Sequence, residues 1–154
     1  MAGVVLSCGI LVLNAQRELL LCHATGSSRW DIPKGMVEPG ETEVETAIRE
    51  AAEECGLTFE PDSLLDLGRY PYRRVKDLHL YAALIERIDT AQCVCSTQFR
   101  DPPGRLRAEM DAFEWVAFDE VAQRCGKSMA AVLTQRVSLP SVLQRLLDTK
   151  AAAG

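Results

Sequence analysis

The sequence predicts a single domain of the α/β (α+β) class. Its 154 residues are enough for one domain that buries about 70% of the surface that its unfolded chain would expose. Apolar stretches of strand length, bounded by polar and turn-forming residues, occur in both halves of the chain, and a helix with clear start and stop signals lies between them. Because no repeat or linker divides the chain, we predict one domain over residues 1–150 and a disordered tail over 151–154.

The first half begins with two predicted strands, 4–13 and 18–23, joined by the polar turn 14–17. A small polar loop, 24–29, and a segment punctuated by Pro and Gly, 30–35, follow. No positive residue precedes the first apolar stretch, and it is too short to span a bilayer. We therefore interpret it as a buried strand and expect a cytoplasmic protein that has no membrane partner.

The central helix is predicted to run from Glu43 to Cys55. Thr42 is a suitable N-cap, and Glu45 three residues later completes a capping box. Gly56 follows the last helical residue, where a left-handed backbone commonly ends a helix.

The second half alternates between strand and helix signals, with a loop that contains Pro102-Pro103-Gly104 between them. The expected elements are strands 64–74, 78–88 and 112–118, a mobile loop at 90–107, and helices 118–125 and 139–147.

Four carboxylates share one face of the central helix, because at about 100° per residue Glu43, Glu50, Glu53 and Glu54 fall within roughly 100° of one another. A separate, narrow stripe of small apolar residues would dock the helix on a sheet and hold the carboxylates outward. Such a cluster is either a solvated face or a site for a divalent cation, which prefers oxygen ligands.

The composition limits the partners. A net charge of −5 argues against an extended nucleic acid, whose binding depends on many Lys and Arg contacts to phosphates. The six cysteines form no C-x-x-C pair, so a zinc site lacks support and reduced thiols in a cytosolic protein are the simpler interpretation. Pairing or metal binding by Cys93 and Cys95 is the alternative.

A longer pattern surrounds the acidic helix. The chain reads G-x5-E-x7-R-E-U-x-E-E-x-G-U over Gly35, Glu41, Arg49-Glu50, Glu53-Glu54 and Gly56-Leu57, with Ala51 in the first apolar (U) slot. This resembles the complete Nudix box, although Ala51 is small for its slot. The resemblance implies a Nudix α/β/α sandwich with a mixed β-sheet over nearly the whole chain, and a Mg²⁺-dependent pyrophosphohydrolase.

The resemblance also implies a metal site. Glu50, Glu53, Glu54 and the carbonyl of Gly35 would bind two or more Mg²⁺ or Mn²⁺ ions. The segment 30–35 is similar to that of bacterial diadenosine tetraphosphate hydrolases and RNA 5′-pyrophosphohydrolases, which also carry a Glu six residues before a Trp. That Glu corresponds here to Glu109, an outlying metal carboxylate, with Asp111 and Glu114 as competitors for its role.

The catalytic roles follow from the same motif. Glu53 or Glu50 would take a proton from the attacking water, and the sequence leaves the choice between them open. Arg49 would orient a catalytic carboxylate through a bidentate pair, with Glu41 as its partner or as an outer metal group.

The candidate substrate contacts are Lys34, Tyr72, Arg73, Arg74 and Phe113. The arginines suit phosphate oxygens and Tyr72 could stack on a base, or else this stretch is a basic edge strand. By resemblance to the dinucleotide hydrolases Phe113 would clamp a base, with a core position as the alternative. Lys34 would reach a phosphate or remain solvated.

Three functions remain open from the sequence. The leading hypothesis is hydrolysis of a small nucleotide, such as a dinucleoside polyphosphate, a nucleoside triphosphate or a nucleotide sugar. The second is removal of pyrophosphate from the 5′ end of RNA. The third is a regulatory Nudix module that binds a nucleotide without catalysis. The specific substrate, the preferred metal and the choice between monomer and homodimer cannot be read from the sequence.

Overall fold

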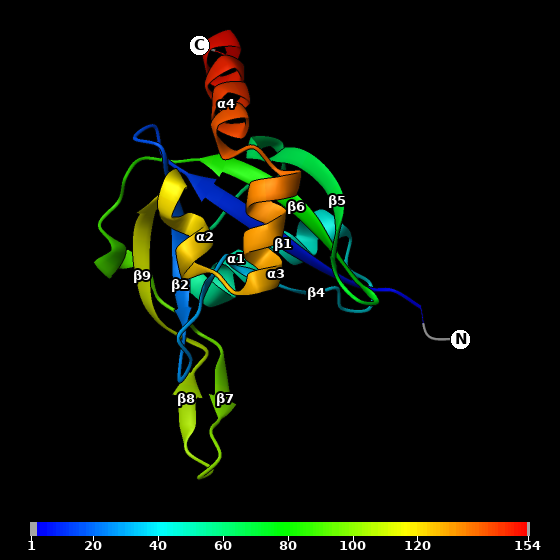
Figure 1. Ribbon diagram of the computed structural model, residues 1–154, viewed down its shortest axis with the longest axis vertical. Coiled ribbons are helices and arrows are strands. Elements are labelled where there is room, and N and C mark those ends of the chain that lie inside the picture. The colour runs from blue at the N-terminus through cyan, green and yellow to red at the C-terminus, as the bar shows by residue number, and fades with distance from the viewer. Residues whose placement is uncertain (1–2, 154) are drawn as a thin grey trace.

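Strand β1 (Val5–Leu13) runs through the middle of the sheet in the computed structural model, which describes residues 3–153 (Figure 1). On one side β1 lies parallel to β6 (Lys76–Leu84) along its whole length. On its other side it pairs antiparallel with β4 (Lys34–Met36) and with the start of β2 (Glu18–Ala24). The sheet is therefore mixed, as the resemblance implied.

The remaining strands extend this sheet or stand apart from it. β5 (Leu65–Arg73) pairs antiparallel with β6 at one edge. β2 pairs antiparallel with both β3 (Trp30–Asp31) and β9 (Met110–Ala117). A separate hairpin of β7 (Gln98–Arg100) and β8 (Leu106–Ala108) projects from the molecule at the end opposite to the C-terminal helix (Figure 1).

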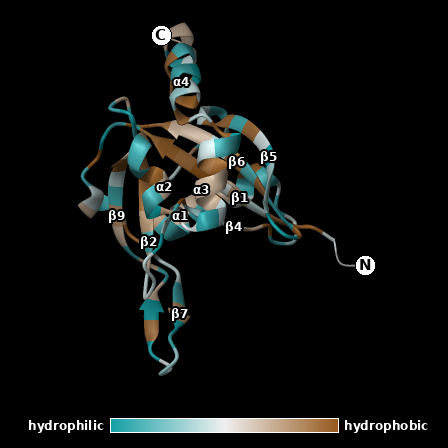
Figure 2. Cartoon of the chain, in the orientation of Figure 1, coloured by the Kyte–Doolittle hydropathy of each residue, from teal (hydrophilic) through white to brown (hydrophobic). Residues whose placement is uncertain are grey.

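The sheet has a hydrophobic core on each face, because β1 is buried on both sides. Its even-numbered residues, such as Ile10 and Val12, pack with helix α1 (Glu43–Cys55), and its odd-numbered residues, such as Leu11 and Leu13, pack with the later helices. Hydrophobic residues accordingly gather on the central strands (Figure 2). The sandwich places α1 alone on one face.

The later helices cover the other face. They are α2 (Val121–Arg124), α3 (Lys127–Ala131), a π-helical turn at Val132–Arg136 that continues α3, and α4 (Leu139–Ala153). Short 3-10 turns occupy Pro61–Ser63, Thr90–Gln92 and Phe118–Glu120. None of the helices within residues 3–153 is long and apolar enough to cross a membrane.

Helix α1 has the bounds that the sequence predicted. The Oγ1 atom of Thr42 accepts a hydrogen bond from the amide of Glu45 at 3.3 Å, and the Glu45 carboxylate accepts one from the amide of Thr42 at 2.8 Å. Gly56 ends the helix with a φ of 73°, a left-handed conformation that a side chain would disfavour. These local signals act over a few residues, which is why they could be read without the fold.

Replacing Thr42 with Ala is expected to lower the free energy of unfolding by about 1 kcal/mol, because it removes the side-chain acceptor of the cap. The melting temperature should fall by roughly 2–4 °C for a domain of this size. Thr42→Ser keeps the hydroxyl and should stay within about 1 °C of the native protein. A calorimetric melt of both variants tests the cap, and equal losses in the two would contradict it.

Several sequence predictions were wrong in their bounds or type. The predicted strand 78–88 is β6, which begins and ends earlier because it follows the register of β1. The predicted loop 90–107 contains the β7–β8 hairpin, and the predicted helix 118–125 is a 3-10 turn followed by α2. Helix α4 continues through Ala153, so residues 151–153 are helical and not a disordered tail, whereas Gly154 lies outside the described residues. No prediction was made for α3.

Candidate active site

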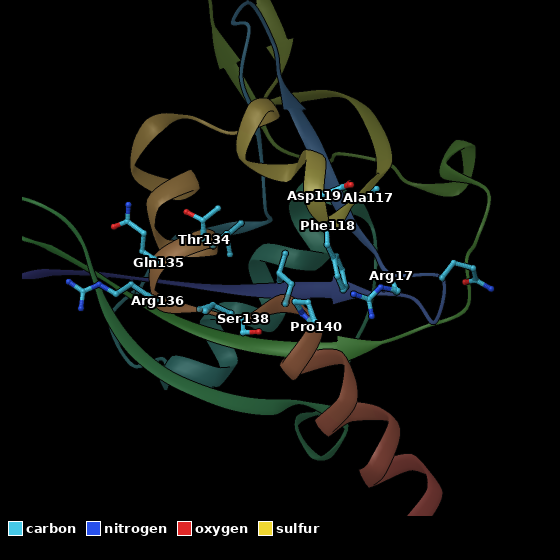
Figure 3. A pocket seen from close by; sticks show the side chains of 13 residues that line it. Arg17, Ala117, Phe118, Asp119, Thr134, Gln135, Arg136, Ser138 and Pro140 are labelled. Atoms are coloured by element: carbon cyan, nitrogen blue, oxygen red, sulfur yellow. The ribbon is translucent and has the colours of Figure 1, made fainter.

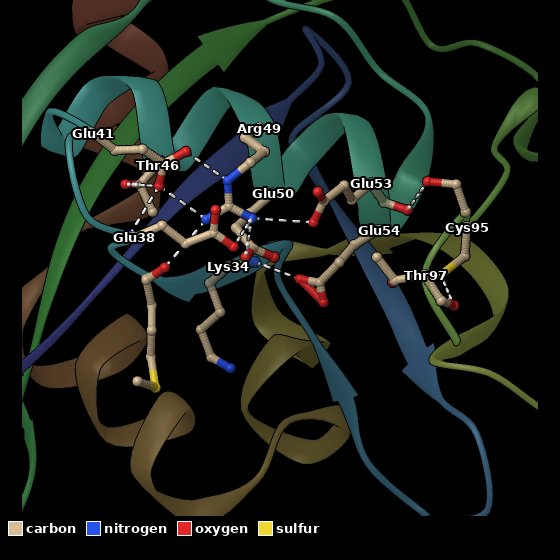
Figure 4. Close-up of polar contacts among 12 residues, drawn as sticks. Lys34, Glu38, Glu41, Thr46, Arg49, Glu50, Glu53, Glu54, Cys95 and Thr97 are labelled. Atoms are coloured by element: carbon tan, nitrogen blue, oxygen red, sulfur yellow. Dashed lines mark hydrogen bonds and ion pairs between the residues drawn. The ribbon is translucent and has the colours of Figure 1, made fainter. Parts of the chain in front are cut away.

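Arg49 is the centre of a charged network on the outer side of α1 (Figure 4). Its guanidinium donates two hydrogen bonds to Glu41, from Nε at 2.6 Å and from Nη2 at 3.0 Å. Its Nη1 atom donates to Glu50 at 2.8 Å and to Glu53 at 3.1 Å. The bidentate pair predicted for Arg49 is therefore made with Glu41, and the same guanidinium gathers two further box carboxylates.

The pKa values in this network follow from its contacts. The hydrogen bonds from Arg49 hold the pKa of Glu41 at about 2. Burial raises the pKa of Glu50 against the opposing effect of Arg49, and the charges of Glu53 and Glu109 raise it further. Glu50 is thus a carboxylate that a nearby cation would stabilise in its ionised form.

Gly35 lies directly against the end of Glu50. A Cβ atom at position 35 would overlap the Glu50 carboxylate, so glycine allows this carboxylate to lie where it does. The strand that carries Gly35 is β4, which pairs with β1 through Cys8 and so is held at a fixed distance from α1. The glycine of the motif is explained here by close approach to a carboxylate.

Glu54 corrects the expectation that all the box carboxylates face outward. It is only 4% exposed, and its carboxylate accepts a hydrogen bond from the backbone amide of Lys34 at 2.7 Å. Burial raises its pKa to about 8, although the amide and the charge of Lys34 oppose the rise. Glu54 therefore points between α1 and β4 and not into bulk solvent.

Glu43 does not join the cluster, although it lies on the same helical face. Its carboxylate accepts hydrogen bonds from Arg69 at 2.9 and 3.1 Å and contacts His79 Nδ1 at 2.6 Å. His79 also contacts Asp66 through Nε2 at 2.7 Å. This part of the acidic face is thus a structural ion-pair network near the start of α1.

Glu109 remains the candidate for the metal-binding carboxylate that lies outside the G-x5-E-x7-R-E-U-x-E-E-x-G-U motif. Its competitors are both engaged, since Asp111 contacts His23 at 2.5 Å and Glu114 pairs with Arg124 at 2.6 Å. Glu109 is exposed and lies close enough to Glu50 for its charge to affect the pKa of Glu50.

The donor set suits a divalent cation, although no three His, Cys, Asp or Glu side chains within residues 3–153 are already arranged to hold one. The Arg49 guanidinium donates to one oxygen of Glu50 and to one oxygen of Glu53. The available ligands are carboxylate oxygens, the type that Mg²⁺ and Mn²⁺ prefer. The Glu50 carboxylate against Gly35 and the buried carboxylate of Glu54 both fit such an ion.

The candidate substrate residues differ in their burial and in their contacts. Lys34 pairs with Asp31 at 3.0 Å and is not simply solvated. Tyr72 is 8% exposed and packs in the core, with Arg73 4.9 Å from its ring centre, which leaves little of the ring free to stack on a base. Phe113 also packs against a core cluster, in line with the alternative we considered.

One cavity next to these residues has a basic lining. It has a volume of about 260 Å³, and its lining includes the cations Arg29, Arg73 and Lys127 together with Tyr72 and one acid, Asp31. Arg74 is exposed in the β5–β6 turn and does not line it. A larger hollow of about 760 Å³ lies elsewhere, beside the β1–β2 turn and the start of α4, and contains none of the box carboxylates (Figure 3).

Sequence reasoning missed several polar residues that hold the site. Asp31 pairs with Lys34, and the Thr46 hydroxyl donates to Glu41 at 2.8 Å. The Asp-x-x-Lys spacing was visible, but outside a helix it does not imply contact. Ser96 donates its amide to the carbonyl of Glu53 at 2.7 Å, and no local signal could have shown a contact across such a long stretch of chain.

Comparisons with known proteins agree with this fold. The NUDIX domain model matches residues 4–137. An uncharacterized 17.7 kDa protein of Enterobacteria phage T4 is 34% identical over 139 residues, which cover 83% of this chain and 92% of the phage protein. The asymmetrical bis(5′-nucleosyl)-tetraphosphatase of Sus scrofa is 31% identical over 140 residues, covering 84% of this chain and 90% of that enzyme.

Solved structures share the fold. The NUDIX domain of Shewanella oneidensis NrtR, solved with ADP ribose, superposes with a TM-score of 0.67 at 15% identity, covering 95% of this chain and 90% of that one.

Proposed function

Because this chain belongs to the Nudix family of hydrolases, we propose that it is a Mg²⁺- or Mn²⁺-dependent pyrophosphohydrolase of a small nucleotide. Its substrate would be a nucleoside polyphosphate type of molecule, such as a dinucleoside polyphosphate, a nucleoside triphosphate or a nucleotide sugar. The observation that carries the proposal is that Glu50 and Glu53 share the Arg49 guanidinium, while the Glu50 carboxylate lies against Gly35 and Glu54 accepts a hydrogen bond from the neighbouring Lys34 amide.

The metal would be held by Glu50, Glu53, Glu54, Glu109 and the carbonyl of Gly35. When bound, it would neutralise the diphosphate and lower the pKa of the attacking water. Glu53 or Glu50 would accept the proton of that water as its oxygen attacks phosphorus. A bond from the water oxygen to that phosphorus would form as the anhydride P–O bond breaks, and the bridging oxygen would leave with the other phosphate, so that each product keeps one of the two phosphates that the bond had joined.

The remaining residues would orient these groups. Arg49, bidentate to Glu41, would keep Glu50 and Glu53 turned toward each other. Lys34 and Arg73 line or flank the basic cavity and would bind phosphate oxygens. In this role Tyr72 is a support for the two cations and not a stacking platform.

A substrate panel tests the proposal. We expect the native protein with Mg²⁺ to hydrolyse one anhydride bond of diadenosine tetraphosphate, a nucleoside triphosphate or ADP-ribose, with the phosphorylated products separated by chromatography, and to lose this turnover in EDTA. Faster turnover of 5′-triphosphorylated RNA than of any small nucleotide would favour the RNA pyrophosphohydrolase alternative. Nucleotide binding without turnover of any panel member would contradict the enzymatic proposal and favour a regulatory module.

A further inference from the structure

The last turn of α1 is covered by a distant segment, residues 93–97. The final carbonyl groups of an α-helix have no partner within the helix. Here the amide of Ser96 donates to the carbonyl of Glu53 at 2.7 Å, and the amide of Val94 donates to the carbonyl of Cys55 at 3.2 Å. The segment therefore binds the backbone of the helix at the residues that carry the box carboxylates.

Gly56 permits this contact as well as ending the helix. A Cβ atom at position 56 would lie 3.0 Å from the carbonyl oxygen and 3.1 Å from the amide nitrogen of Val94. These distances are tighter than ordinary van der Waals contacts, and the neighbour is backbone that cannot rotate away. The glycine thus brings residues 93–97 against α1.

The same segment holds Glu109. The amide of Glu109 donates to the carbonyl of Thr97 at 3.0 Å, at the foot of the β7–β8 hairpin. On its other side, the carbonyl of Glu109 accepts from the amide of Thr25 at 3.0 Å. Ser96 and Thr97 are therefore two consecutive residues whose backbone groups connect the backbone of Glu53 to that of Glu109.

The backbone of Ser96 makes the shorter contact. Its hydroxyl also reaches the Glu53 carbonyl, but at 3.3 Å against 2.7 Å for the amide. Figure 4 shows Cys95 and Thr97, the neighbours of Ser96, beside the end of α1 that carries Glu53. A change that removes the amide should therefore matter more than one that removes the hydroxyl.

We propose that Ser96 is a positioning residue, whose backbone amide fixes the foot of the β7–β8 hairpin to α1 and so sets the place of Glu109 relative to Glu50 and Glu53. This inference rests on the proposed function, because it assumes that Glu109 acts with the box carboxylates. It assigns a mechanical role to the hairpin, which projects from the molecule and is joined to α1 by the hydrogen bond of Ser96 at its foot (Figure 1).

The first test compares two variants of one residue. Ser96→Pro removes the amide donor, and we expect kcat to fall roughly 10–100-fold with KM changed by no more than about threefold. Ser96→Ala keeps the amide, and we expect kcat within about threefold of the native value. Equal losses in the two variants, or a loss that appears only in KM, would overturn the proposal.

A double-mutant cycle separates positioning from a general structural role. If Ser96 acts through Glu109, the variant that combines Ser96→Pro with Glu109→Gln should be no slower than Glu109→Gln alone. If the fold-losses in kcat of the two single variants multiply in the double variant, Ser96 supports the fold independently of Glu109. Titration of Mn²⁺ alone into the same four proteins repeats the cycle without substrate, so it remains decisive if the panel shows no turnover and the proposed function fails.

Hydrogen exchange in the native chain covers the case in which Ser96→Pro does not fold. The hydrogen bonds donated by the amides of Ser96 and Glu109 should open together, so the two amide protons should exchange with protection factors within about threefold of each other. Independent opening of the two amides would contradict the proposed mechanical link.

Discussion

Glu53→Gln and Glu54→Gln are each expected to lower kcat by about 100-fold or more in the presence of Mg²⁺. Both replacements keep the size of the side chain and an oxygen acceptor, so the hydrogen bonds from Arg49 and from the Lys34 amide can persist. What is lost is the negative charge that would hold a divalent cation and, at Glu53, a candidate proton acceptor. The measurement is the steady-state rate with the best substrate of the panel.

A matched control removes one carboxylate elsewhere. Glu60 is exposed at the start of a 3-10 turn and makes no side-chain capping bond, so Glu60→Gln should retain activity within about twofold. Calorimetry should show the three variants folded with melting temperatures close to that of the native protein. Native-like rates in both box variants would contradict the assignment of the site to α1.

Arg49→Ala should reduce both activity and stability. The side chain makes charge-assisted hydrogen bonds to Glu41, Glu50 and Glu53 and is largely shielded from solvent. Without it, three acidic groups lose their shared cation, and the free energy of unfolding in EDTA should fall by about 2 kcal/mol. We expect kcat to fall roughly 10–100-fold, because the carboxylates lose the group that orients them.

Arg49→Lys is the control for charge without geometry. A lysine restores one positive charge but cannot form the two parallel hydrogen bonds to Glu41. It should therefore recover part of the stability and little of the activity. Chemical denaturation with and without Mg²⁺ adds a second readout, since added metal should offset more of the stability loss in Arg49→Ala than in Arg49→Lys. Full activity of Arg49→Ala would contradict the prediction, because it would show that Arg49 does not orient the carboxylates.

The prediction of helix α1 from the sequence was accurate at both ends, whereas most other elements shifted. The capping box at Thr42 and the left-handed Gly56 act within one turn, so the local sequence contains all the information. The end of β6 depends instead on how far β1 runs beside it, and the hairpin within 90–107 depends on pairing across a turn. These are interactions between segments, and periodicity within one segment does not report them.

The candidate site residues were predicted from the sequence alone, because the spacing from Gly35 to Leu57 forms a recognisable pattern of residue types, which the fold places on strand β4 and along helix α1. The surroundings and the partners of each carboxylate depend on the tertiary structure. Packing of α1 against β4 buries Glu54 below the Lys34 amide, and Arg69 and His79 draw Glu43 out of the cluster. The helical angle of a residue is a local quantity, whereas its burial and its partners depend on which strands and loops the fold brings against it.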